Sequence, residues 1–154
     1  MHTHDPKTET RLLEALGQIR PEELPGFFNA HREELITDSR PFAAYMRETF
    51  RKKGVLQQNV FLAADLSENY GYKLISEEKH TVNRDTILRL CLAAGFSVPE
   101  TQEALILYGM APLYVRFPRD IVFVAAIRHR IRDVHQLNAL MHSCGLPPLT
   151  DERE

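Results

Sequence analysis

Apolar residues recur at helical spacing along nearly the whole chain, and no stretch alternates apolar and polar residues as a half-buried strand would. Prolines and glycines divide this pattern into short segments, because proline suits the first turn of a helix and glycine suits the position after its last turn. The segments expected to be helical cover residues 5–20, 21–36, 41–53, 57–64, 67–75, 83–94, 98–108, 118–131 and 133–144. The chain is therefore predicted to be all-α, a compact bundle of about eight helices.

Local signals mark where some of these helices begin. Ser67 can cap the segment that follows it by accepting a backbone hydrogen bond. Ser97 and Glu100 form the Ser-x-x-Glu pattern of a capping box. Residues 121–127 are rich in β-branched side chains and could form a buried strand, but the apolar spacing extends to Ile131 and favours a helix.

The composition excludes several classes of protein. Nineteen Lys and Arg against 21 Asp and Glu give a formal charge of -2, so any contact with DNA requires a local basic patch. Cys91 and Cys144 lie outside any Cys-x-x-Cys pair or zinc-finger spacing, which predicts neither a metal site nor a disulfide framework. The polar start and the lack of a long apolar run predict no signal peptide and no membrane anchor, hence a cytoplasmic protein.

No arrangement of catalytic residues stands out. The chain has no Gly-rich phosphate loop, nucleophile elbow, His-Glu-x-x-His helix or close pair of carboxylates on recognisable scaffolding. His135 and His142 can share a helix face, but no carboxylate accompanies them at the spacing of a metal site. We therefore expect a binding protein without cofactor or metal rather than an enzyme.

The most informative pattern lies in residues 41–95: a helix ended by glycine, a short helix, a tight turn, a serine-capped short helix, a loop and a buried helix. The two short helices make a helix-turn-helix candidate. Their order resembles the Cro-like, or XRE-type, family of transcriptional regulators, which share the helix-turn-helix of phage repressors. The residues that carry this resemblance are Gln57 at the start of the first short helix, Ala63 or Ala64 in its packed half, and Leu66-Ser67 at the entry to the recognition helix.

Further residues resemble an uncharacterised bacterial subgroup of this family, so the likeness spans roughly residues 10–149. They are Tyr70-Gly71-Tyr72-Lys73-Leu74-Ile75-Ser76, Asn83-Arg84-Asp85, Gly95-Phe96-Ser97, Ala111-Pro112-Leu113-Tyr114, Arg119-Asp120 and Asn138. We divide the chain into an N-terminal helical extension (1–38), a helix-turn-helix core (39–110), a C-terminal helical segment packed on the core (111–150) and a tail (151–154).

The resemblance implies that the second short helix enters the major groove, which is about 12 Å wide, and offers its first residues to base edges. Asn69 could then read adenine, Lys73 could contact phosphate or guanine, and Glu68 could accept only from cytosine. Gln57 could grip backbone phosphate. The full set of candidate DNA contacts is Gln57, Gln58, Ser67, Glu68, Asn69, Tyr70, Lys73, Lys79 and Arg84.

This region departs from the family pattern and is acidic. Glu77 stands where the family usually has glycine, and Thr81 stands near its usual proline. Residues 57–79 hold four acids against two bases, so phosphate would repel this region alone. Two stretches with a net charge of +4 each, residues 40–53 and 116–132, can compensate if the fold brings either of them beside the recognition helix.

Two hypotheses of function follow. The first is a sequence-specific regulator that binds double-stranded DNA, as a homodimer because paired half-sites raise affinity and specificity. The second is a protein-protein interaction module, such as an adaptor or an antitoxin-like partner, that keeps the same scaffold without a surface able to bind DNA. The acidic recognition region motivates the second hypothesis.

Overall fold

The computed structural model describes residues 6–150, and all regular structure in that range is helical. The α-helices are α1 (Pro6–Leu16), α2 (Leu24–Ala30), α3 (Pro41–Lys53), α4 (Gln57–Ala63), α5 (Glu68–Ile75), α6 (Arg84–Ala93), α7 (Val98–Leu107), α8 (Pro118–Arg128) and α9 (Val134–Ser143). Two 3-10 turns, η1 (Pro21–Glu23) and η2 (Arg32–Glu34), flank α2. The predicted all-α class is confirmed, with nine α-helices in residues 6–150 against an expected number of about eight.

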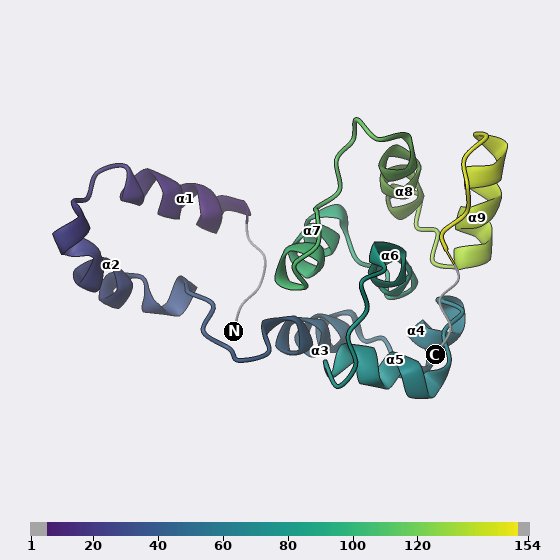
Figure 1. Cartoon of the computed structure of the whole chain (residues 1–154), viewed down its shortest axis with the longest axis horizontal. Coiled ribbons are helices and arrows are strands. Elements are labelled where there is room, and N and C mark those ends of the chain that lie inside the picture. Colours follow the sequence, from purple (N-terminus) through teal and green to yellow (C-terminus); the bar gives the residue numbers. More distant parts are fainter. Residues whose placement is uncertain (1–5, 151–154) are drawn as a thin grey trace.

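The helices form two groups, which Figure 1 shows side by side. Helices α1 and α2 make an arm, drawn in purple and blue, that lies apart from α3 to α9. An ion pair between Arg11 and Glu34, 3.2 Å apart, joins the two ends of the arm. Phe27 is its buried aromatic residue and packs on His31, with ring centroids 4.4 Å apart.

Helix α6 is the centre of the second group. It packs against α4, α7 and α9, and every residue from Asp85 to Ala93 is buried. A helix that is buried on almost every side is stable only when other helices surround it. One hydrophobic cluster runs from Phe42 to Leu149, so the segments 39–110 and 111–150 share a single core.

A buried arginine connects two distant parts of this core. The Arg89 side chain lies in the middle of α6 and is only 3% exposed. One Nη atom donates to the Ala64 carbonyl at the end of α4, and the other donates to the Leu149 carbonyl, at 3.3 and 3.2 Å. Because cations favour the carbonyl end of a helix, this contact stabilises the end of α4.

The predicted starts of the helices are confirmed where they rested on local signals. Ser67 accepts a hydrogen bond from the Tyr70 amide at 3.2 Å. Ser97 and Glu100 form the expected capping box at the start of α7. Residues 118–128 form a helix rather than a strand, although it ends at Arg128 instead of Ile131.

The prediction of one helix over residues 21–36 is wrong. The structure breaks this segment into η1, α2 and η2, and α1 ends at Leu16 rather than near residue 20. Pro25 lies in the first turn of α2, followed by Gly26, a weak helix former. Short helices gain most of their stability from packing, and the arm offers little surface to pack on.

Helices α6 and α8 are joined at their first turns by two ion pairs, which we call the Arg-Asp clamp. Arg84 donates to both carboxylate oxygens of Asp120 at 3.0 Å. Arg119 donates in the same way to Asp85, at 3.3 and 3.0 Å. Both carboxylates are buried, and each arginine also donates to backbone carbonyls, Arg84 to residues 111–112 and Arg119 to residues 147–148. The clamp therefore fastens two irregular segments to the core.

The ionised form of Asp85 is favoured by this arrangement. Burial alone would raise its pKa, but hydrogen bonds from Arg119 and Thr150 outweigh burial and lower the pKa below its ordinary value. A carboxyl group with a lowered pKa stabilises the fold above its unfolded pKa, and this stabilisation is lost as the pH falls through the folded pKa.

The helices of residues 6–150 are all too short or too polar to cross a membrane.

Candidate nucleic-acid interface

Helices α4 and α5 pack closely at the edge of the bundle, joined by the turn Ala64–Ser67. Gly71 is the point of closest approach, because a Cβ added there would overlap the ring of Phe61. Asp65 holds the turn in a left-handed conformation, with φ of 56°. The sequence thus fixes the two short helices in one arrangement, with α5 on the outside of the molecule (Figure 1).

The first turn of α5 is open to solvent. Ser67, Glu68 and Asn69 are all exposed, while Lys73, one turn later, is half-buried. These four predicted contact residues therefore lie on one exposed edge. We call this edge, made of Ser67, Glu68, Asn69, Tyr72 and Lys73, the α5 edge.

The start of α4 lies next to the α5 edge. Gln58 is exposed and donates through Nε2 to Glu68 at 3.1 Å. Gln57 precedes it and is half-buried. The amide of Gln58 thus occupies one oxygen of the Glu68 carboxylate, but the negative charge stays at the edge.

Two tyrosines of α5 have opposite environments. Tyr70, a predicted DNA contact, is only 7% exposed and belongs to the hydrophobic core. Tyr72 is 42% exposed and packs edge-on against Phe61, with centroids 5.0 Å apart. The prediction for Tyr70 is corrected: its ring faces the core, and Tyr72 is the aromatic residue at the surface. The helical spacing of Leu66, Tyr70 and Leu74 was the signal in the sequence, since residues four apart share a face.

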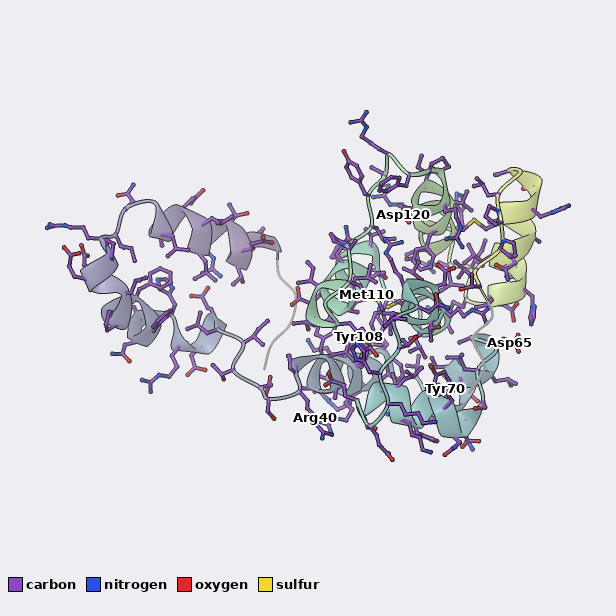
Figure 2. All side chains as sticks on the ribbon, viewed as in Figure 1. Arg40, Asp65, Tyr70, Tyr108, Met110 and Asp120 are labelled. Atoms are coloured by element: carbon purple, nitrogen blue, oxygen red, sulfur yellow. The ribbon has the colours of Figure 1, made fainter. Side chains whose placement is uncertain are left out.

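Arg84, another predicted contact, has a structural place. Its guanidinium is held by the buried carboxylate of Asp120 and by the carbonyls of Ala111 and Pro112. Figure 2 shows Asp120 near the top of the bundle and Tyr70 at the opposite edge, so the clamp lies far from α5. Arg84 is therefore removed from the candidate interface.

Lys79 lies in the loop after α5 and remains exposed. Its amide donates to the Lys73 carbonyl at 3.0 Å, and its ammonium lies 5.9 Å from the centroid of the Tyr70 ring. Both lysines of the region are thus at or near the end of α5, on the solvent side.

Glu77, which replaces the expected glycine, has an unusual backbone. Its φ is 62°, a conformation that favours glycine. Its Oε2 accepts a hydrogen bond from the Ala43 amide in the first turn of α3, at 3.2 Å. Arg40, the residue before α3, caps no amide with its own side chain. Glu77 therefore acts as the cap of α3 from the neighbouring loop.

Two variants of Glu77 separate the cap from the backbone effect. Glu77→Ala removes the cap but keeps a side chain at positive φ, so we expect the free energy of unfolding to fall by about 1 kcal/mol. Glu77→Gly also removes the cap but relieves backbone strain of about 1 kcal/mol, so it should be nearly neutral. Urea unfolding followed by circular dichroism measures both. Equal losses in the two variants would contradict the capping role.

The fold brings only one of the two basic stretches beside α5. Helix α3 packs against α5, and Arg40 donates to the Ser76 carbonyl at the end of α5, at 3.1 Å. Arg47 is exposed further along α3. The stretch 116–132 has no such position, because α8 packs against α7 and α9 and Arg119 belongs to the clamp.

Comparisons with known proteins give no relative: no family model, no curated protein and no solved structure matches this chain. Among residues 6–150, no three His, Cys, Asp or Glu side chains gather as ligands of a metal ion would. The candidate interface therefore rests on the geometry and charge of α3, α4 and α5.

Proposed function

We propose that this chain is a DNA-binding transcriptional regulator in which α4 and α5 form a helix-turn-helix and α5 enters the major groove. The observation that carries the proposal is the α5 edge, where Asn69 is exposed and Lys73 half-buried beside a basic helix. A short helix held by its partner can place its first residues on base edges.

Each side chain of the α5 edge has a chemistry suited to one type of contact. Asn69 can form two hydrogen bonds with adenine, and Lys73 can donate to guanine or to phosphate. Tyr72 offers an aromatic face with a hydroxyl. Glu68 can accept a hydrogen bond from cytosine, and its negative charge disfavours a phosphate at the same place. Both properties would restrict the DNA sequences that bind.

The charge of the region supports binding once α3 is included. Residues 57–79 alone are acidic, but residues 40–79 together hold seven bases and five acids. Glu77 is turned onto the start of α3, where its carboxylate accepts from the Ala43 amide and keeps its negative charge. Arg40, Arg47 and Lys79 are then the cations available to phosphates on either side of the groove.

A titration of double-stranded DNA against salt concentration tests the proposal. Fragments from the region around the gene, and sequences selected from a random pool, are followed by fluorescence anisotropy. We expect Lys73→Ala to reduce the slope of log K against log salt by about 1. Asn69→Ala should weaken binding to the selected sequence by roughly 5- to 150-fold, equivalent to about 1–3 kcal/mol.

Matched controls come from outside α3, α4 and α5. Arg116 and Gln136 are exposed and lie outside the interface, so Arg116→Ala and Gln136→Ala should bind DNA as the parent protein does. Binding that is absent at low salt, or that is weakened equally by these controls, would rule out the proposal.

The arm supports a second candidate function, a protein-protein interaction module. Leu13 and Phe28 are 63% and 56% exposed on helices that pack little against the rest of the molecule. Apolar side chains gathered on a projecting element commonly mark a contact with another protein. Under this alternative, the parent protein shows no affinity for DNA but forms a homodimer or a complex that is lost with Leu13→Ser and Phe28→Ser.

A further inference from the structure

A pocket of about 460 Å³ lies where the turn after α6 faces the end of α8. One wall is the turn from α6 to α7, residues 95–99, and the other is the end of α8 with the turn that follows it, residues 127–132. Small-molecule sites in proteins commonly have volumes of about 300 to 1,000 Å³. The pocket therefore has the size of a ligand site.

The pocket is lined by both apolar and cationic side chains. The apolar part of the lining consists of Leu92, Phe96, Val98, Ile127 and Ile131. The cationic part consists of three arginines from one short segment, Arg128, Arg130 and Arg132. These three residues form the arginine rim.

Within residues 6–150, the arginine rim has no hydrogen-bond or ion-pair partner. None of its three side chains forms a hydrogen bond or an ion pair with the described residues, whereas Arg84, Arg89 and Arg119 all do. The carboxylates next to it in the sequence and at the start of α7 are occupied. Asp133 caps α9 through the His135 amide at 2.8 Å, and Glu100 pairs with Lys53 at 2.7 Å. No carboxylate in residues 6–150 therefore forms an ion pair with the rim.

Backbone geometry holds two of these arginines at the pocket. A Cβ at Gly95 would lie 2.7 Å from Cζ of Arg132, so glycine allows this guanidinium to lie directly on the turn. Arg130 has a φ of 60°, at a position that in α3, α6, α7 and α9 is taken by glycine. An arginine at a site that favours glycine is a cost to stability, and it places a third cation beside the pocket.

We propose that this pocket binds a small organic anion, with an apolar body against the interior and a phosphate monoester at the arginine rim. Guanidinium groups bind phosphate through paired hydrogen bonds, and a doubly charged group suits a rim of three cations better than a single carboxylate. The site does not use the α5 edge. This inference therefore stands whether or not the chain binds DNA.

Titration with phenyl phosphate, followed by the backbone amide resonances of the full chain, tests the proposal. We expect saturable shifts at Gly95, Ser97 and Ile131, which line the pocket. Phenol lacks the charge and inorganic phosphate lacks the apolar body, so each should bind more weakly than phenyl phosphate. Benzoate carries a single negative charge and should also have a lower affinity than phenyl phosphate. Sodium chloride at equal ionic strength should not reproduce the shifts.

Variants of the rim identify the site. Arg132→Gln and Arg130→Gly should each weaken phenyl phosphate binding by about fivefold or more, since each loses a charge-assisted hydrogen bond. Glycine suits the backbone at residue 130, so that variant should fold at least as well as the parent. The control Arg116→Gln removes an exposed arginine outside the pocket and should leave the affinity unchanged.

Three results would overturn the proposal. They are shifts that do not saturate, shifts spread over the surface instead of the pocket, and equal losses of affinity in the control and the rim variants. Competition between phenyl phosphate and DNA for the parent protein would also overturn the proposal if it disappeared in the Lys73→Ala variant. Such a result would place the anion at the α5 edge.

Discussion

Asp120→Ala is expected to lower the free energy of unfolding by about 3 kcal/mol. The substitution leaves the Arg84 guanidinium without its carboxylate and removes the acceptor of the Tyr114 amide, which donates to Asp120 at 2.9 Å. Arg84 also holds residues 111–112, so the segment between α7 and α8 should loosen first. Chemical unfolding measures the loss, and amide exchange in residues 111–117 locates it.

An exposed ion pair provides the control for this prediction. Arg51 and Glu48 approach to 2.6 Å, closer than any pair in the clamp, but their side chains are 67% and 23% exposed, against 6% and 9% for the clamp carboxylates. Glu48→Ala should therefore change stability little, because water screens an exposed pair. The double variant Arg84→Ala/Asp120→Ala should lose less than the sum of its two single variants. Additive losses, or a loss at Glu48 equal to that at Asp120, would show that the clamp is no stronger than a surface contact.

Gly71→Ala is expected to lower the free energy of unfolding by about 2 kcal/mol, although alanine is the better helix former. The new methyl group would overlap the Phe61 ring, which is buried and has no room to turn away. Helices α4 and α5 must then separate or tilt. Thermal unfolding measures the loss, and the variant should also lose DNA affinity if α5 is the recognition helix.

Gly26→Ala is the matched control, because an added Cβ at Gly26 meets nothing within 4 Å and the residue lies in α2. It should leave stability unchanged or raise it by about 0.5 kcal/mol. If Gly71→Ala behaves in the same way, close packing of α4 on α5 is not what requires glycine at this position.

Features of the fold that depend on near neighbours were predictable from the sequence. The caps at Ser67 and Ser97 were predicted because each involves residues within one helical turn. The burial of Tyr70 was also predictable from the sequence, since its spacing from Leu66 and Leu74 places it on the buried face. The prediction failed because Tyr70 is one of the first residues of the expected recognition helix, and its buried spacing was not given priority over that position.

Features that join distant segments could not be predicted in this way. Arg84 and Asp120 are 36 residues apart, and nothing in the spacing of either pairs them. The role of Glu77 could not be predicted for the same reason. The sequence shows a glutamate in place of the family's glycine, but the amide that Glu77 caps belongs to α3, 34 residues earlier. The position of the basic stretches depended on how α3 and α8 pack, which charge counting alone does not determine.

Arg89 has a practical consequence for handling this protein. One guanidinium supports both the carbonyl before the α4–α5 connection and the carbonyl of Leu149. A shortened form that lacks Leu149 would leave half of that guanidinium buried without an acceptor, far along the chain from the deletion. Any fusion or trimming at this end should therefore keep Leu149, so that the Arg89 guanidinium retains both of its acceptors.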